Sequence, residues 1–309
     1  MSVLQVEHLT KRYGQTNAVD EVTLTLEPGR SYGLIGRNGA GKTTLMRLIT
    51  GLAFPTAGTI SLFSEPGPLP QPAQLRRLGC LIEAPGILDS MSAAENLRMH
   101  RMIRGIPSRT RDGELLELVG LSGAGRKRTR NFSLGMKQRL GIAIALLASP
   151  ELLILDEPVN GLDPSGVVEV RRLLAELQRE RGITMIISSH NLPELYQTAT
   201  DYILMDQGQI RQTLTLAELE QRCQHYLRIT TDDPAELTRI LETEFGTRNF
   251  TVVANGSVHL HEGLDDPAAV LRRLTEHGIY PSAFVREGET LESYFLSVVG
   301  AGAPGEARS

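Results

Sequence analysis

The chain has 309 residues, a length that suits one α/β domain together with a smaller appended domain. Hydrophobic residues make up 41% and charged residues 22%, which is typical of globular proteins and excludes extensive disorder. The formal net charge of −4 argues against binding to duplex DNA or anionic lipid through overall charge.

Cysteine usage and hydropathy bear on the compartment. Cys80 and Cys223 are the two cysteines, and they are far apart without the spacing of metal ligands, which fits a reducing compartment. The N-terminal residues lack the basic start and apolar core of a secretory signal. No apolar run reaches the roughly 18 to 20 residues needed to span a bilayer. If this protein acts at a membrane, we expect another chain to supply the spanning part.

The first third predicts strands, a glycine-rich loop and a helix. Residues 3–26 alternate between apolar and polar side chains on either side of a turn at 13–15, which indicates short antiparallel strands. A short apolar run, 31–36, then leads through a glycine-rich loop into helical sequence at 43–50.

The middle of the chain predicts helices and a parallel sheet. A proline-rich surface loop at 65–72 precedes a strand at 78–83. Ser92 and Glu95 form a capping-box pattern before helical sequence that runs to about Val119. Further strands and helices are predicted at 151–157 (strand), 167–182 (helix), 183–190 (strand) and 201–210 (strand and turn). The apolar strands on either side of the 167–182 helix form a βαβ unit of a parallel sheet.

After about Ala217 the pattern changes to a second, smaller domain. The predicted elements are a strand at 225–231, a helix at 234–245, a hairpin at 249–261 that turns at Asn255-Gly256, a helix at 267–278, a strand at 282–288 and a helix at 290–299. The succession β-α-β-β-α-β predicts a ferredoxin-like α+β domain. We therefore expect domains at 1–215 and 216–300 and a disordered tail at 301–309.

The glycine-rich loop has the pattern of a phosphate cradle. Residues 36–43 fit G-x-x-x-x-G-K-[ST], and a predicted strand and helix flank them. A chance match is the alternative, and the flanking elements argue against it. Lys42 would reach the β and γ phosphates of ATP, and the Thr43 hydroxyl would bind Mg²⁺. The candidate nucleotide-binding residues of the loop are Gly36, Arg37, Asn38, Gly39, Ala40, Gly41, Lys42, Thr43 and Thr44.

Two carboxylates end the apolar segment 151–157. At the carboxyl edge of a parallel sheet, Asp156 would bind Mg²⁺ and Glu157 would act as the general base for an attacking water. Taken alone, two acids at a strand end are as often a solvated turn. The phosphate loop elsewhere in the chain makes the catalytic interpretation the better one.

The segment 131–138 carries a Ser-x-Gly tripeptide at the start of a predicted helix, where hydroxyl and N–H groups favour an anion. With this segment, the chain resembles the ATP-binding-cassette ATPases. The resemblance implies that Ser133 and Gly135 reach across a dimer interface to the γ phosphate held by the other subunit. By itself, Ser-Leu-Gly is far more often a simple helix cap.

Further positions match that family in the expected order. Tyr13 stands where the family stacks an aromatic ring on adenine, Asp163 follows the two carboxylates, and His190 follows the next strand. The resemblance implies that His190 contacts the γ phosphate and holds the attacking water with Glu157. Each position alone has a plainer explanation: a turn tyrosine, a helix cap before Pro164, and a strand-end histidine.

The chain departs from the commonest family pattern at two places. Glu83 stands where most members carry Gln in the loop that touches Mg²⁺ and the membrane partner, so it adds a charge to a candidate metal and nucleotide ligand. Leu134 and Met136 stand where Gly and Gln are commoner. The segments 81–85 and 132–139, with a C-terminal Leu-Glu-Ser-Tyr-Phe-Leu, are similar to the branch of bacitracin and lantibiotic self-protection exporters.

The resemblance covers Val3 to about Gln212 and implies an α/β P-loop NTPase with an antiparallel β subdomain and a helical subdomain. It further implies ATP and Mg²⁺ as cofactors, and a homodimer or a heterodimer with a related ATPase. The partner would be an integral-membrane permease, with the ATPase at the cytoplasmic face of the membrane and no nucleic acid bound. For the C-terminal domain, a small-molecule sensor, a dimerisation clamp and a permease brace stay open.

Two rival functions share the phosphate loop. A soluble ATP-binding-cassette protein of DNA repair or translation would need long coiled coils, zinc modules or two fused cassettes, and we find one cassette and no heptad run. A phosphotransferase would not explain the Ser-Leu-Gly signature at residues 133–135 or His190. A transport ATPase is therefore the favoured hypothesis, and the resemblance to the bacitracin and lantibiotic exporters implies export of an antimicrobial peptide.

Overall fold

The computed structural model describes residues 2–65, 70–107, 110–190, 192–223, 225–253, 256–288 and 290–300. Its described residues form two compact units, one made of residues up to 216 together with 297–300 and the other of residues within 217–296. The first unit contains two sheets and the second contains one, and the predicted tail at 301–309 lies outside the described residues.

The first unit contains a six-stranded sheet in the order β5-β6-β7-β3-β8-β9. All of its neighbouring strands are parallel except the last pair, because β9 returns directly from β8 through a turn. Its strands are β3 (Ser31–Ile35), β5 (Leu78–Leu81), β6 (Leu152–Leu155), β7 (Thr184–Ser189), β8 (Asp201–Asp206) and β9 (Gln209–Thr215). Four of the five parallel strands are buried at almost every position, as the continuous apolar runs predict for strands covered on both faces.

A second, antiparallel sheet opens the chain. It has the order β2-β1-β4, with β1 (Leu4–Tyr13), β2 (Thr16–Leu26) and β4 (Ala57–Leu62). The alternating segment 3–26 therefore forms the predicted antiparallel strands. Its apolar residues pack into one core with β3, β6, β7 and β8, and the buried face of α1 (Lys42–Ile49) contributes to the same core. The start of α1 is thereby held at the end of β3.

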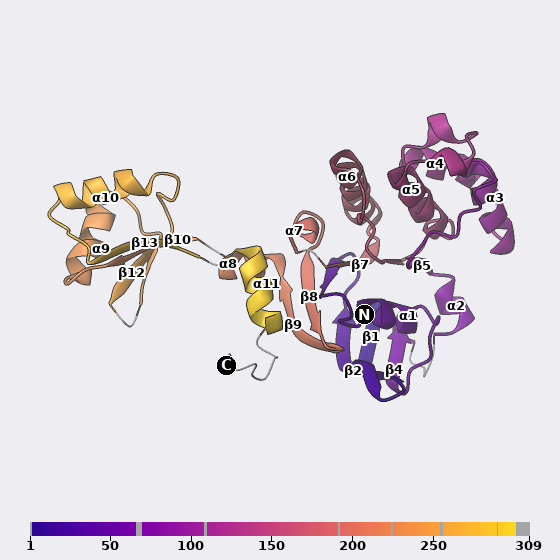
Figure 1. Cartoon of the computed structure of the whole chain (residues 1–309), viewed down its shortest axis with the longest axis horizontal. Helices are drawn as coiled ribbons and strands as arrows, with labels where there is room; N and C mark the ends of the chain where they lie inside the picture. Colours follow the sequence, from indigo (N-terminus) through magenta and orange to yellow (C-terminus); the bar gives the residue numbers. More distant parts are fainter. Residues whose placement is uncertain are drawn as a thin grey trace, which may run out of the picture. The chain divides into compact units, whose positions relative to one another are not determined.

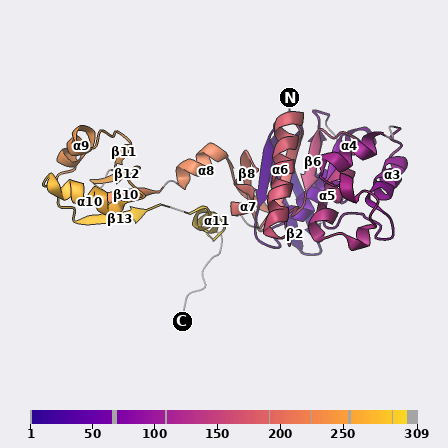
Figure 2. The ribbon, with the colours of Figure 1, turned by 90° about the horizontal axis from the view of Figure 1, so that it is seen from above.

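The remaining helices of the first unit follow the sheet strands. They are α2 (Pro72–Leu75), α3 (Ala93–Ile103), α4 (Thr110–Leu118), α5 (Leu134–Ala145), α6 (Pro164–Arg181) and α7 (Leu192–Leu195). Figure 1 shows α3, α4 and α5 gathered together as a helical subdomain. Helices α5 and α6 run side by side (Figure 2).

Two predictions for the middle of the chain need correction. The helical segment expected to run to Val119 is two helices, because Pro107 follows Ile106 and disfavours helical backbone before it. The proline-rich segment is not a loop throughout, since Pro72 is the first residue of α2. Residues 66–69 of that segment lie outside the described residues.

The second unit contains the predicted β-α-β-β-α-β succession. Its elements are α8 (Leu216–Arg222), β10 (Tyr226–Thr230), α9 (Pro234–Thr243), β11 (Phe250–Val252), β12 (Ser257–Leu260), α10 (Pro267–Glu276), β13 (Ala283–Glu287) and α11 (Leu291–Gly300), of which α8 begins and α11 ends in the first unit. The antiparallel sheet has the order β11-β12-β10-β13, and β11 pairs with β12 as the predicted hairpin. Asn255 of the predicted turn lies outside the described residues.

The helices of the second unit begin where their sequence predicts. Asp233 and Asp266 are the N-caps, each accepting a backbone N–H with its side chain, and a proline occupies the first helical position after each. The buried faces of α9 and α10 pack on one face of the sheet, with Leu241 of α9 completely buried.

Among the residues that the structure describes, every helix is too short or too polar to traverse a lipid bilayer.

Replacing Leu241 with alanine should destabilise the second unit, because the side chain is 0% exposed and a cavity would remain. We expect the free energy of unfolding to fall by about 2–5 kcal/mol, measured by urea denaturation. The control is Val252→Ala, which removes a half-exposed side chain of the same unit and should cost less than about 0.5 kcal/mol. Equal losses for the two variants would contradict the assignment of this core.

Candidate functional site

Four loops carry most of the predicted site residues, and all four leave the carboxyl ends of parallel strands. The phosphate loop 36–41 follows β3, Glu83 follows β5, Asp156 and Glu157 follow β6, and His190 follows β7. In a parallel sheet these ends share one edge, which is where ligands bind in open α/β sheets. The topology therefore brings residues from distant parts of the sequence to one place.

The phosphate loop is tightly seated before α1. Gly41 has a backbone φ of 103°, and a Cβ atom at this position would lie 2.3 Å from the carbonyl oxygen of Ala18. Only glycine fits there, as the pattern predicts. The loop turns through a hydrogen bond from the N–H of Ala40 to the carbonyl of Arg37, 3.1 Å long, and α1 begins at Lys42.

Lys42 is buried and turns back over the loop. Its Nζ donates to the carbonyl oxygens of Gly36 at 2.6 Å and Arg37 at 3.3 Å, and lies 3.7 Å from Oε1 of Glu157. Burial lowers the pKa of Lys42, while the negative charges of Glu157 and Asp156 act in the opposite direction. A buried ammonium group at the mouth of the loop is thus available for a phosphate.

A chain of hydrogen bonds joins the phosphate loop to the two carboxylates. The Thr43 hydroxyl donates to Oδ2 of Asp156 at 2.8 Å. The Ser188 hydroxyl donates to Oδ1 of the same carboxylate at 2.6 Å and accepts the backbone N–H of Glu157 at 2.8 Å. Thr43 and Asp156 are therefore brought together as predicted, whereas Ser188 was not among the predicted site residues. Its signal was a pair of serines at the end of an otherwise apolar strand before His190.

Glu157 and His190 form the pair that the resemblance implies. Nδ1 of His190 lies 2.9 Å from Oε2 of Glu157, and the other oxygen of that carboxylate faces Lys42. Glu157 has a φ of 48°, which is the left-handed region that residues other than glycine seldom adopt. Residues held in such strained backbone conformations cluster at functional sites, and the side chain of this one lies between a histidine and a buried lysine.

Glu83 is placed differently from the other acids. Its carboxylate forms an ion pair with Arg47 of α1, and its φ of 65° is also left-handed. Among the described residues, no hydrogen bond or ion pair joins Glu83 to Thr43 or Asp156. The structure thus brings together two of the three predicted metal ligands, Thr43 and Asp156, and pairs the third, Glu83, with Arg47. Arg47 was not predicted, because its role depends on a contact between distant segments.

The signature residues lie at the start of a helix, as predicted. Ser133 is the N-cap of α5 and its Oγ accepts the backbone N–H of Met136 at 3.3 Å. Gly135 lies beside the segment 162–166, which includes Asp163, the N-cap of α6. The Ser165 hydroxyl donates to Asp163 at 2.6 Å and lowers the pKa of that carboxyl. The two helix starts are therefore adjacent.

Tyr13 ends β1 and is half exposed, with Nζ of Lys11 4.9 Å from the centre of its ring. The exposed ring is available for stacking on a planar group. The structure does not join it to the carboxylates through any contact among the described residues.

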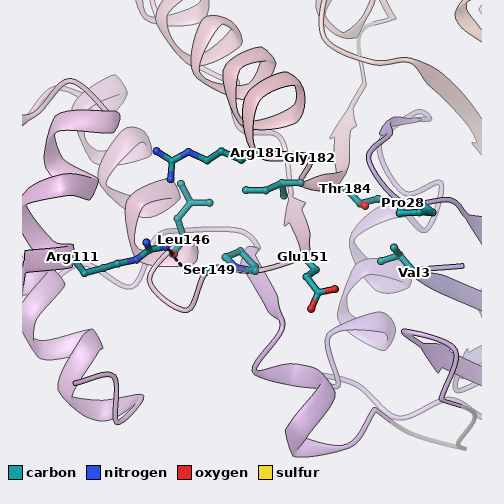
Figure 3. A pocket seen from close by; sticks show the side chains of 11 residues that line it. Val3, Pro28, Arg111, Leu146, Ser149, Glu151, Arg181, Gly182 and Thr184 are labelled. Carbon is teal, nitrogen blue, oxygen red and sulfur yellow. Dashed lines mark hydrogen bonds between the residues drawn. The ribbon is translucent and has the colours of Figure 1, made fainter. Parts of the chain in front are cut away.

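A hollow of about 330 Å³ lies away from this site. Figure 3 shows it lined by Glu151, just before β6, and by Thr184, the first residue of β7, so it belongs to the amino ends of those strands. Arg111 points into it and donates to Ser149 at 2.6 Å and to the carbonyl of Leu146 at 3.3 Å. Arg111 there satisfies the end of α5, and the hollow carries none of the motif residues.

Comparison with known proteins identifies the family to which this chain belongs. The family model described as "ABC transporter" matches residues 19–160. The bacitracin transport ATP-binding protein BcrA of Enterococcus faecalis is 39% identical over 97% of both chains. The lantibiotic transport ATP-binding protein SrtF of Streptococcus pyogenes is 41% identical over 65% of this chain and 85% of its own. The dimeric ATP-binding cassette MJ0796, bound to ADP and phosphate, shares the fold at a TM-score of 0.63 and 22% identity, over 69% of this chain and 98% of that one.

Similarity along almost the whole chain, together with a phosphate loop joined to a carboxylate pair, establishes the assignment: this chain belongs to the ABC transporter family, as one of its ATP-binding ATPase subunits.

Proposed function

We propose that a dimer of this chain hydrolyses ATP to drive a separate integral-membrane permease that exports an antimicrobial peptide. The observation that carries the proposal is the contact of Glu157 with both His190 and Lys42 at the mouth of the phosphate loop. A carboxylate in that position faces the end of a nucleotide whose phosphates lie on the loop.

Glu157 would act as the general base for the attacking water. It would accept the proton of the water, while His190 would hold the carboxylate and the water in place through its ring nitrogens. Lys42 would leave the carbonyls of the loop for the β and γ phosphates, and the backbone N–H groups of residues 36–44 would surround them. Tyr13 would stack on adenine.

The donor atoms around Asp156 suit Mg²⁺. The Thr43 hydroxyl and the Asp156 carboxylate are hard oxygen ligands that already lie 2.8 Å apart, and Mg²⁺ commonly takes one or two protein oxygens together with phosphates and water. When bound, Mg²⁺ neutralises negative charge that develops on the phosphates. Glu83 would join this set only after leaving Arg47.

The second copy would complete each ATP site. In one chain, Ser133 and Gly135 lie at the exposed start of α5, next to Asp163 at the start of α6. Free N–H groups at a helix start bind anions, so this edge would meet the γ phosphate held by the other copy. The dimeric state of MJ0796, which has the same fold, supports this arrangement. A heterodimer with a related ATPase would use the same edge.

The surface around residues 82–86 would receive the permease. This loop lines an apolar hollow of about 140 Å³ with the exposed Leu52, and Cys80 lines both this hollow and a groove of about 840 Å³. Arg76, Arg104 and Arg111 line that groove, and none of the described residues that line it is acidic. The chemistry fits a cytoplasmic segment of the permease with apolar residues flanked by acidic ones. The chain would then act at the inner face of the membrane.

The substrate class follows from the relatives. BcrA is named for bacitracin transport and SrtF for lantibiotic transport, and the match to BcrA extends through the second unit. We infer export of a peptide of this kind. The rival function on nucleic acid or ribosomes has no support from these relatives, and we do not propose it.

We also propose that the domains follow the expected division at 215/216, with residues 216–300 as an accessory domain. The separate core of α9, α10 and their sheet supports an accessory domain that folds around its own interior.

Replacing Glu157 with glutamine should abolish turnover and leave nucleotide binding intact, because the amide keeps the size of the side chain but cannot accept the proton. We expect kcat for ATP hydrolysis to fall by at least about 100-fold. Glu151→Gln, at the other end of β6 and paired with Arg77, is the control and should retain normal turnover. Turnover within about threefold of wild type in the Glu157→Gln protein would exclude Glu157 as the general base.

Mixing two inactive variants tests the shared site. Lys42→Ala removes the phosphate contact of a site, and Ser133→Ala removes the contribution of the opposite copy. A mixed dimer would hold one doubly defective site and one intact site, so an equal mixture should regain up to about a quarter of wild-type ATPase activity if each intact site works alone. If the mixture stays as inactive as the two variants, composite sites that work independently are excluded.

The permease surface is tested by Leu52→Glu, which places a charge beside the apolar hollow. We expect co-purification with the membrane protein encoded beside this chain to fall about tenfold while the basal ATPase activity of the isolated chain is kept. Val168→Glu, an equally drastic change at an exposed position of α6, is the control. Normal co-purification of the Leu52→Glu protein would rule out this surface.

A further inference from the structure

Ser188 occupies a buried position between the two acids of the site. It lies in β7, is 0% exposed, and its Oγ makes two short hydrogen bonds, donating to Asp156 and accepting the N–H of Glu157. Strand β6 ends immediately before these acids, and β7 is its parallel neighbour. One hydroxyl group of β7 therefore contacts both residues at the end of the neighbouring strand.

The bond to Asp156 fixes the orientation of its carboxylate. Thr43 occupies Oδ2 and Ser188 occupies Oδ1, so neither oxygen can rotate without losing a partner. The carboxylate is almost completely buried, and water has little access to replace a lost bond. Without the Ser188 hydroxyl, the carboxylate would keep only one of these two restraints.

The bond to Glu157 acts on the backbone. At a φ of 48°, Glu157 adopts an unfavourable left-handed conformation, and a fixed partner for its N–H helps to hold it there. This conformation determines where the side chain points, which is at His190 and Lys42. Relaxation of the backbone would turn the carboxylate away from both.

We propose that Ser188 is a positioning residue of the ATPase site, whose single hydroxyl sets the Asp156 carboxylate and the Glu157 backbone together. The role requires a group that donates and accepts at the same time, which a hydroxyl does and a methyl group does not. This inference rests on the proposed roles of Asp156 in holding Mg²⁺ and of Glu157 as the base. It adds a residue that touches neither ATP nor the attacking water.

The variants are Ser188→Ala and Ser188→Cys, and the matched control is Ser31→Ala. Ser31 is a completely buried serine of β3, the other neighbour of β7, and within the described residues its hydroxyl has no hydrogen-bond partner. Its replacement therefore removes a buried hydroxyl from the same sheet without touching the acids. Ser188→Cys keeps the shape of the side chain but hydrogen-bonds weakly, and decides the outcome if Ser188→Ala does not fold.

Three quantities are measured: kcat for ATP, the Mg²⁺ concentration that half-saturates binding of a fluorescent ATP analogue, and the affinity of that analogue without Mg²⁺. For both Ser188 variants we expect kcat to fall and the half-saturating Mg²⁺ concentration to rise, each by about 10- to 100-fold for alanine and less for cysteine. Affinity without Mg²⁺ should stay within about twofold of wild type, since the phosphate loop is unchanged.

The control separates positioning from general destabilisation. If Ser188→Ala and Ser188→Cys match Ser31→Ala in kcat and in Mg²⁺ dependence, or if affinity falls equally with and without Mg²⁺, Ser188 has no positioning role. These results leave the proposed function intact, because wild type still hydrolyses ATP. A wild-type protein without ATPase activity would instead overturn the proposed function.

Discussion

The site depends on one carboxylate that is held from two sides. Asp156 accepts one hydrogen bond from the hydroxyl of Thr43 at the start of α1 and another from the hydroxyl of Ser188 in β7. A single buried carboxylate therefore joins the end of the phosphate loop, β6 and β7. The register of the parallel sheet makes this geometry possible, because it aligns the carboxyl ends of β6 and β7 beside β3. The apolar core beneath, shared by both sheets of the first unit and α1, keeps these ends from moving independently.

Charge balance at this edge has a simple arrangement. The positive charge of the buried Lys42 offsets part of the negative charge of Asp156 and Glu157. Its ammonium group also donates hydrogen bonds to the carbonyls of the loop. A nucleotide would bring several negative charges into this surrounding. The lysine would then exchange carbonyl oxygens for phosphate oxygens, which are its stronger partners. Such an exchange costs little because the ammonium group is already desolvated.

Local patterns predicted much of the fold. The phosphate loop, the capping box at Ser92 and the proline-led helices of the second unit are short-range features, and the structure has each of them. The break in the helical segment 93–119 had a signal in Pro107 that the periodicity concealed. The loop after β3 was found from its glycine-rich motif, the two acids after β6 from their place at the end of an apolar strand, and His190 after β7 from the family resemblance. Their roles in catalysis stay predictions, as does the domain boundary at 215/216.

What the sequence did not reveal depends on contacts between distant segments. Ser188 gains its importance only when β7 is known to lie beside β6, because the pair of serines before His190 does not by itself show which groups they contact. Glu83 was expected near the metal because the family pattern places it there, yet its partner is Arg47 from another part of the chain. An exposed ion pair between distant segments cannot be predicted from the spacing of apolar and polar residues.

The packing of α5 on the loop at 82–86 has a mechanical consequence. A Cβ atom on Gly141 would lie 2.7 Å from Cβ of Pro85, so any side chain there would clash and the helix packs directly against the loop. Ser133 stands eight residues before this contact, which is about 12 Å along the helix axis. A tilt of α5 by about 10° around the contact with Pro85 would displace Ser133 by about 2 Å. A displacement of that size is enough to make or break a hydrogen bond. A shift of the loop that tilted α5 in this way would be amplified at the edge that would meet the second copy.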